Sequence, residues 1–190
     1  MGYNSLGANT TASYNTALGD TSLAANTTGE YNTAVGQGAL QTNSTAAANT
    51  AVGYAALNQS NAAHNTAVGY HALDANTTGE YNVAVGYNAM TQSTTAIRCT
   101  AVGREAGESL TTGSYNTLLG YTAGHEITTG YRNVAIGEES AYFVTTGSLN
   151  VAVGNQTLHL LTTGNENTAL GFRACYGAVS YTHLTLPTKA

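Results

Sequence analysis

The sequence predicts an all-β protein whose short strands stack into a parallel β-solenoid, and three observations lead to this prediction. A glycine recurs at intervals of 17 residues. Each interval contains a run such as Thr33-Ala34-Val35, with β-branched residues at alternate places and a glycine after it, which is typical of a short strand. Charged residues make up only 8% of the chain, so long amphipathic surface helices are not expected.

The recurring glycines, called repeat glycines below, set the size of the unit. A unit of 17 residues is shorter than a helix pair or a leucine-rich repeat, but it suits one coil of a solenoid. About ten such coils, spaced by about 4.8 Å, would form a rod roughly 50 Å long. A single deletion shortens the interval from Gly53 to Gly69 to 16 residues. The repeat glycines are Gly2, Gly19, Gly36, Gly53, Gly69, Gly86, Gly103, Gly120, Gly137, Gly154 and Gly171.

Stacked coils place equivalent residues in columns along the rod. The column four positions before the repeat glycine is the asparagine column, and we interpret it as a structural ladder or turn brace rather than a row of ligand-binding amides. Its members are Asn15, Asn32, Asn49, Asn65, Asn82, Asn116, Asn133, Asn150 and Asn167, with Cys99 in the remaining copy. The residue just before the glycine is always aliphatic: Leu18, Val35, Val52, Val68, Val85, Val102, Leu119, Ile136, Val153 and Leu170.

A second glycine follows a Thr-Thr pair in most units. This Thr-Thr-Gly segment predicts a turn with a positive φ at its glycine, because glycine has no Cβ to oppose that conformation. The glycines concerned are Gly29, Gly79, Gly113, Gly130, Gly147 and Gly164.

Two further columns exchange volume, and we expect them to fill one cavity from either side. The first filling column contains Leu23, Leu40, Leu57, Leu73 and Met90, then Gly107, Gly124 and Ala141. The second filling column contains Asn26, Asn43, Ser60, Asn76 and Ser93, then Leu110, Ile127 and Val144. The next coil carries both Leu158 and Leu161 and breaks this exchange.

The strand motif is apolar on both faces, which predicts that a second layer covers the face turned away from the coil. We therefore expect lateral association of identical chains around a rotation axis. Tyrosines recur in two columns, which favours packing or interface roles over sugar stacking. The first tyrosine column holds Tyr14, Tyr31, Tyr81 and Tyr115, and the second holds Tyr54, Tyr70, Tyr87 and Tyr121.

No constellation of catalytic residues is recognisable, so we expect no enzyme, no cofactor and no metal. The five histidines occupy slots without partnered acids, and Asp20 and Asp74 are the only aspartates. Five Lys and Arg residues are too few for a nucleic-acid-binding patch. No apolar run has the roughly 20 residues that a membrane span needs. Cys99 and Cys175 occupy different slots, so we expect free thiols, most simply small buried side chains.

These repeats resemble those of a known group of proteins. YNTAVGQGALQTNSTAAANTAVGYAAL and NTTGEYNVAVGYNAM resemble the 17-residue repeats of phage and prophage tail fibres. They are also similar to the head repeats of trimeric autotransporter adhesins (the YadA-like β-roll), whose Ala-Ile/Val-Gly step is matched by Ala34-Val35-Gly36. The resemblance implies a left-handed β-roll, a homotrimer, and a place on a virion or a bacterial cell surface, outside the cell. Adhesin head repeats are usually shorter, so the coil shape is expected to differ.

We expect residues 1–175 to form the solenoid, as a fragment truncated at both ends. Residues 176–190 leave the repeat register and resemble translated adapter sequence, so we expect a tail that is not native. The predicted function is a structural and binding one: a shaft or head segment of a trimeric fibre for attachment to a host or cell surface. A surface glycan or a protein receptor would bind through regions outside the fragment.

Two other functions fit the composition less well. An ice-binding solenoid would use ranks of threonine, but Thr27 and Thr28 are neighbours on opposite strand faces, so only one of them could join a rank. A polysaccharide-binding or polysaccharide-cleaving solenoid would need the carboxylates and basic residues that such sites use.

Truncation of Leu40 tests whether the two filling columns share one cavity. Leu40→Ala should lower the free energy of unfolding by about 2–5 kcal/mol, as truncation of core residues does. Adding Asn43→Leu to this variant should restore part of the loss, as measured by chemical denaturation. Equal stability of Leu40→Ala and the wild type would contradict the interpretation.

Overall fold

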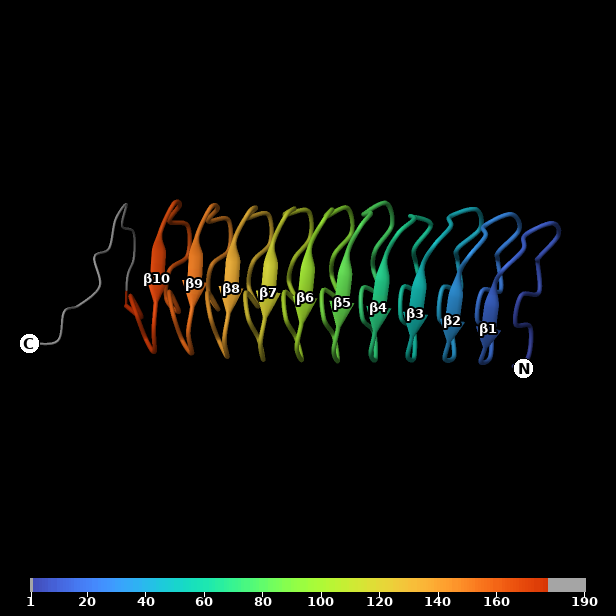
Figure 1. Ribbon diagram of the computed structural model, residues 1–190, viewed down its shortest axis with the longest axis horizontal. Helices are drawn as coiled ribbons and strands as arrows, with labels where there is room; N and C mark the ends of the chain where they lie inside the picture. The colour runs from blue at the N-terminus through green and yellow to red at the C-terminus, as the bar shows by residue number, and fades with distance from the viewer. Residues whose placement is uncertain (1, 178–190) are drawn as a thin grey trace, which may run out of the picture.

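The computed structural model describes residues 2–177 and has ten short strands in a single parallel sheet (Figure 1). The strands follow one another in chain order, and the described residues contain no helix. The predicted all-β parallel solenoid is therefore confirmed. The strands are β1 (Thr16–Leu18), β2 (Thr33–Val35), β3 (Thr50–Val52), β4 (Thr66–Val68), β5 (Val83–Val85), β6 (Thr100–Val102), β7 (Thr117–Leu119), β8 (Val134–Ile136), β9 (Val151–Val153) and β10 (Thr168–Leu170).

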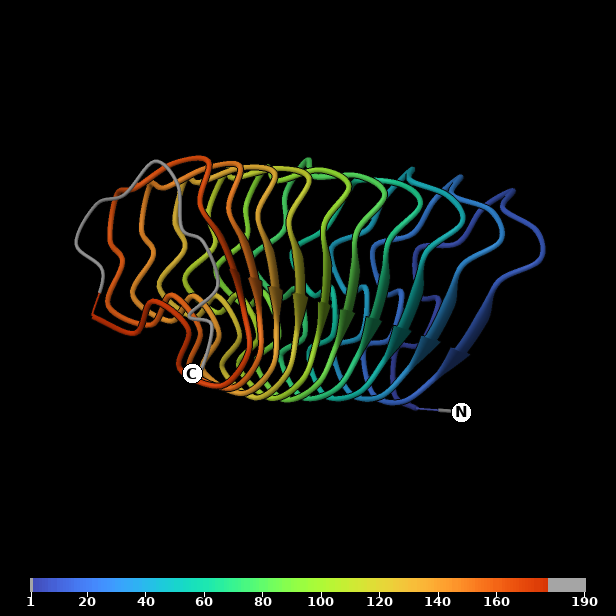
Figure 2. The ribbon, with the colours of Figure 1, turned by 60° about the vertical axis from the view of Figure 1, so that its left-hand side comes forward.

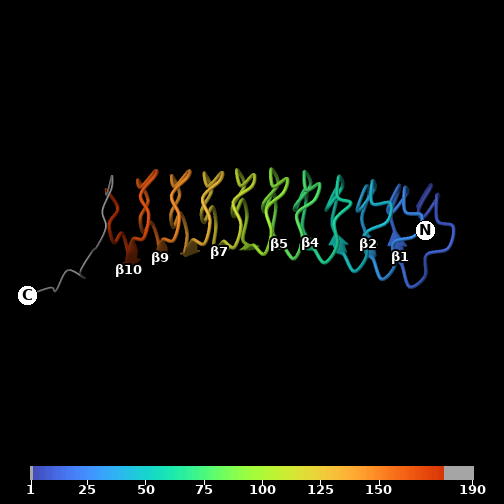
Figure 3. The same cartoon turned by 90° about the horizontal axis from the view of Figure 1, so that it is seen from above.

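Each coil lies on the next in register, so that equivalent residues are paired along the rod. In β2 and β3, Ala34 pairs with Ala51 and Val35 pairs with Val52. The strands line one side of the rod, and the turns form the rest of each coil (Figures 2 and 3). A strand therefore pairs only with its neighbours in sequence, which is the arrangement expected of a solenoid.

The turns between strands use their backbone groups in two ways. The amide of Leu23 donates to the carbonyl of Ala39 in the next coil, at 3.0 Å, whereas the amide of Asn26 donates to Leu23 in its own coil, at 3.2 Å. This mixture recurs from coil to coil. Irregular segments thus remain hydrogen-bonded despite their lack of secondary structure, as buried backbone groups require.

The repeat glycines lie where adjacent coils approach most closely. Gly53 has a φ of 137°, and a Cβ added to it would collide with the carbonyl oxygen of Gly69. The same collision recurs at Gly86, where the obstacle is the carbonyl oxygen of Gly103. Both the φ angle and the lack of space require glycine at this position.

The prediction of a positive φ in the Thr-Thr-Gly segment is wrong. The described structure assigns positive φ to the residue two positions later, for example Tyr31 and Tyr81, each with a φ of 60°. A Cβ on Gly79 would collide with the carbonyl oxygen of Ala96. Alanine nevertheless occupies this slot in other coils, as at Ala46 and Ala96. The slot therefore selects a small residue because the next coil passes close by, and no unusual φ is involved.

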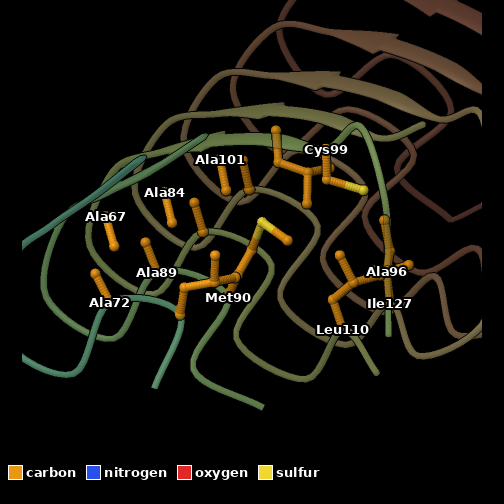
Figure 4. Close-up of a cluster of buried hydrophobic side chains, with 14 of the residues drawn as sticks. Ala67, Ala72, Ala84, Ala89, Met90, Ala96, Cys99, Ala101, Leu110 and Ile127 are labelled. Atoms are coloured by element: carbon orange, nitrogen blue, oxygen red, sulfur yellow. The ribbon is translucent and has the colours of Figure 1, made fainter. Parts of the chain in front are cut away.

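The core is a narrow column of small and aliphatic side chains between the sheet and the turns. Ala84 and Ala101 project inward from β5 and β6, and Ala89 and Met90 project from the turn that follows β5 (Figure 4). All four are fully buried. The flanking strand residues, such as Val83 and Val85, point away from this core and are half-buried. Alternation along the strand thus puts alanine inside and the larger residues outside.

The exchange between the filling columns involves a third position, on the strand, that was not predicted from the two columns. A Cβ on Gly107 would lie 2.6 Å from Cδ1 of Leu118, and one on Gly124 would lie 2.7 Å from Cδ2 of Leu118. Ile127 Cδ1 lies 2.8 Å from that same Cβ position at Gly124. Leu118 stands in β7 where the other strands have alanine. The space left by two glycines is therefore filled from both the strand and the turn.

The second filling column changes chemistry as well as volume. In the N-terminal coils it is a buried polar ladder, in which Asn43 Nδ2 donates to Asn26 Oδ1 at 3.1 Å and to the Ala46 carbonyl at 3.0 Å. In the C-terminal coils, Leu110 and Ile127 are fully buried in the same column. Adding leucine at position 43 would remove two hydrogen bonds, so its rescue of Leu40→Ala should be partial.

The shortened coil is repaired by the side chain of Asn61. In other coils two consecutive amides, such as those of Thr27 and Thr28, donate to one carbonyl of the next coil. In the coil before the deletion, the amides of Ser44 and Thr45 both donate to Asn61 Oδ1, at 3.1 Å. A side-chain amide oxygen thus takes the place of the missing backbone carbonyl.

At the C-terminal end, Tyr176 and Gly177 continue the last turn, and the amide of Leu160 donates to the carbonyl of Tyr176 at 3.0 Å. Most of the predicted out-of-register tail, residues 178–190, lies outside the described residues.

Two glycine-to-alanine substitutions distinguish the two kinds of glycine. Gly53→Ala should lower the free energy of unfolding by about 3 kcal/mol or more, because alanine is strained at this φ and its Cβ meets the backbone of the next coil. Gly79→Ala should cost clearly less, since alanine occurs in that slot elsewhere. Urea denaturation of both variants measures the difference. Equal losses would contradict the distinction.

Candidate interaction surfaces and side-chain ladders

The asparagine column is buried and bonds each coil to the next. Asn32 Oδ1 accepts a hydrogen bond from the amide of Asn49 at 3.0 Å, and Asn32 Nδ2 donates to the carbonyl of Ala46 at 2.9 Å. The same pair of bonds recurs at Asn116, which bonds to Asn133 and Gly130. Each amide therefore joins two points of the neighbouring backbone, and direct bonds between amides are secondary. Most of these side chains are buried and bonded inside the rod, although Asn49 Nδ2 has no partner, so the column acts as a structural ladder.

Cys99 takes the place of asparagine in one coil and imitates it weakly. Its Sγ lies 3.4 Å from the carbonyl of Gly113, to which it donates, and it accepts from the amide of Asn116 at 3.4 Å. Burial raises the pKa of the Cys99 thiol to about 11. The thiol therefore remains protonated at neutral pH and is a poor nucleophile. Cys99 and Cys175 are both free thiols.

The outward side of the ten-stranded sheet, called the outer sheet face below, is a regular surface of the rod. Two residues of each strand point out from it, and none of them is charged. The aliphatic residues before the repeat glycines form one column, and a threonine or valine two positions earlier forms the other. Most are half-buried, while Val102 is 39% exposed and Val151 is 37% exposed. The second column is Thr16, Thr33, Thr50, Thr66, Val83, Thr100, Thr117, Val134, Val151 and Thr168.

The tyrosine columns stack ring on ring along the rod. Tyr70 and Tyr87 have ring centroids 5.2 Å apart with an interplanar angle of 7°. Arg104 continues this column, with its guanidinium 5.7 Å from the Tyr87 ring and 5.5 Å from the Tyr121 ring. Because neighbouring groups cover the ring faces, the edges and hydroxyls are what solvent reaches. A sugar stacks on a ring face, so this arrangement favours the packing and interface roles.

The first tyrosine column is built in the same way. Arg98 lies between Tyr81 and Tyr115, with its guanidinium 5.6 Å from the first ring and 5.7 Å from the second. Arg98 also donates to the Tyr115 hydroxyl at 2.9 Å. Within the described residues, arginine thus extends both aromatic columns by cation–π contacts.

The two threonines of the Thr-Thr-Gly segment have different surroundings. Thr27 Oγ1 donates to the carbonyl of Ser44 in the next coil, at 3.0 Å, and Thr77 donates to Thr94 in the same way. Thr28 and Thr78 are exposed. The hydroxyl of the first threonine is therefore bonded to the next coil, and a row of solvent-exposed threonines with free hydroxyls could be formed only by the second threonine of each pair.

The prediction that the histidines lack acidic partners is wrong for three of them. His71 Nδ1 lies 2.6 Å from Asp74, and His159 Nε2 lies 3.3 Å from Glu139. His125 has two partners: its Nε2 lies 3.1 Å from Glu108 Oε2, and its Nδ1 lies 2.9 Å from Glu126 Oε1. For Glu108 and Glu139 the missed signal is the repeat itself, because residues 17 to 20 apart lie side by side in adjacent coils. Asp74 and Glu126 lie within three residues of their histidines, so local spacing could have indicated them.

All of these acids and histidines except His71 and Asp74 lie on the turns of the C-terminal half, a region called the glutamate–histidine groove below. A shallow depression of about 320 Å³ runs along it, lined by Glu105, Tyr121, Glu139, Tyr142 and His159 among others. The Tyr142 ring packs on His125 at 4.9 Å and on His159 at 5.5 Å. Burial, and then the negative charges of Glu126, Glu139 and Glu105, raise the pKa of Tyr142.

Comparison with protein families, with curated proteins and with solved structures returned no match for this chain. Within residues 2–177, no helix has the length and apolar character needed to cross a membrane.

Replacing Cys99 by asparagine tests the energetic role of the asparagine column. Cys99→Asn should raise the free energy of unfolding by about 1 kcal/mol, because an amide forms both bonds to the next coil at ordinary length. The matched control, Asn82→Cys, should lower it by a similar amount. Chemical denaturation under reducing conditions measures both. If Cys99→Asn is no more stable than the wild type, the column does not hold the coils together in this way.

Proposed function

We propose that this chain is a shaft or head segment of a fibre, in which identical chains associate laterally through the outer sheet face. The supporting observation is that face itself: ten strands present two columns of outward side chains without a single charge among them. One of these columns is aliphatic in every strand, and soluble monomers rarely expose a continuous apolar strip of this length. A second copy of the chain is the simplest cover for it.

The residues beside the outer sheet face fit an interface. The tyrosine columns, with Arg98 and Arg104, precede and follow the strands along the chain, and their members are largely exposed. Tyrosine and arginine are enriched in protein interfaces, where charged residues are depleted from the centre. An uncharged strip beside aromatic and guanidinium groups has this composition.

Association around a rotation axis parallel to the rods would repeat the same contact at every coil. Chains placed side by side and in register bring equivalent residues to the same height, so each coil adds one more copy of the interface. Two or three chains could each cover one strip around a central axis. We propose three, because this number agrees with the resemblance to trimeric fibres.

A rod of this kind would act as a stiff spacer. It would hold receptor-binding regions away from a virion or a cell, and several identical chains would provide avidity for a repetitive surface. The receptor, whether a glycan or a protein, would be bound by regions outside this segment.

Ice binding is the second candidate function for the same face. Its threonine column, seen in Thr33, Thr50 and Thr66, lies on a flat sheet with strand spacing of about 4.8 Å. An ice-binding chain would keep this face free and remain monomeric, whereas a fibre segment would cover it. Measurement of thermal hysteresis alongside the oligomeric state separates the two functions.

A charge on the outer sheet face tests the proposed association. The wild-type chain should sediment as a trimer, and Val85→Lys should shift it to the monomer, because the lysine would be buried between subunits. The matched control is Gln92→Lys, which adds the same charge at an exposed turn position and should leave the trimer intact. Sedimentation velocity gives the mass, and circular dichroism shows whether the variants are folded. A wild-type chain that is folded and monomeric at all concentrations would contradict the proposal.

A further inference from the structure

The glutamate–histidine groove contains a set of metal-ligand side chains that no other part of the described chain has. Glu105, Glu108 and His125 each offer a ligand atom, and these atoms all lie within 4.8 Å of one another. The two glutamates come from the turn after β6, and His125 comes from the turn after β7. The three side chains are half-buried. We propose that they bind a first-row divalent transition metal ion such as Zn²⁺, which would link two adjacent coils.

The distances suit a coordination polyhedron. His125 Nε2 lies 3.1 Å from Glu108 Oε2. Two ligands bound to zinc at about 2.0–2.1 Å, at tetrahedral or octahedral angles, are separated by a similar distance, roughly 2.9–3.4 Å. One imidazole and two carboxylates form a donor set that suits zinc and neighbouring transition metals better than Ca²⁺, which prefers oxygen ligands throughout.

The orientation of His125 is fixed before any ion arrives. Its Nδ1 is held by Glu126 Oε1 at 2.9 Å, and its ring lies parallel to Tyr142, with an interplanar angle of 2° and a centroid distance of 4.9 Å. A carboxylate on the second nitrogen of a metal-binding histidine sets the tautomer and increases the basicity of the ligating nitrogen. Nε2 is then directed at the glutamates.

The local charge also favours a cation. Glu105, Glu108 and Glu126 lie in this region of the turns, and the opposing charge is Arg104, which contacts Glu105 at 2.9 Å.

The same groove contains an internal control two coils further on. Glu139 and His159 have the same 20-residue offset as Glu105 and His125, and their side chains are 3.3 Å apart. Tyr142 stands there in the slot that Glu108 occupies in the first set. This second pair therefore lacks the third ligand, and we expect it to bind the ion much more weakly.

Zn²⁺ binding by the whole chain tests the proposal, with isothermal titration calorimetry as the measurement and the unfolding temperature as a second readout. The wild type should bind one Zn²⁺ per chain, and Zn²⁺ should raise its unfolding temperature. Glu108→Gln and His125→Asn should each raise the dissociation constant by at least about tenfold. The slot of both residues holds Gln41 and Asn58 in earlier coils, so these side chains fit the fold.

The control is His159→Asn, which makes the same change in the two-ligand pair and should leave the stoichiometry and affinity unchanged. Lowering the pH should release the ion, because protons compete with it for the imidazole and carboxylate ligands. The proposal is overturned if the folded wild type shows no saturable binding of Zn²⁺. It is also overturned if His125→Asn binds as tightly as the wild type, or if His159→Asn loses the binding instead.

Discussion

The close stacking of one coil on the next is the constraint from which the rest of this structure follows. Coils separated by about the spacing of hydrogen-bonded strands must be nearly identical in path, since any residue that bulges along the axis meets its neighbour. The repeat glycines show the limit: at Gly53 the next backbone is so near that a methyl group has no room. A strict repeat length in the sequence is the consequence.

This constraint also explains why the interior is polar along the asparagine column. Each coil has amides and carbonyls near the strand that have no partner in their own coil. The asparagine side chain of the preceding coil forms hydrogen bonds with them. Alanine fills the interior beside it because the coil is too thin for larger side chains on the strand. Where Leu118 does enter from a strand, glycines at positions 107 and 124 make the space for it. Stability is then a sum of similar contributions between neighbouring coils.

Several features could be predicted from the sequence because they repeat. The strands, the glycine spacing and the stacked columns depend on residues that return at a fixed interval, so one coil predicts the others. The features that were missed belong to single coils or to contacts between them. The two hydrogen bonds accepted by Asn61 Oδ1 and the contact between His125 and Glu108 depend on which residues of adjacent coils meet. A chain analysed one unit at a time does not show them. Positive φ was predicted for the wrong residue of the Thr-Thr-Gly turn. Glycine occupies that slot because the next coil leaves little space for a side chain, as at Gly79, and not because of its φ.

The most direct test of the stacked-coil architecture is a set of distances along the rod. Spin labels at the exposed positions Thr28, Thr129 and Thr163, measured in pairs by electron–electron double resonance and diluted with unlabelled chain, report the rise per coil. The stack predicts about 29 Å for six coils, between positions 28 and 129, and about 38 Å for eight coils, between positions 28 and 163. Backbone separations that do not grow in proportion to the number of coils would contradict the stack.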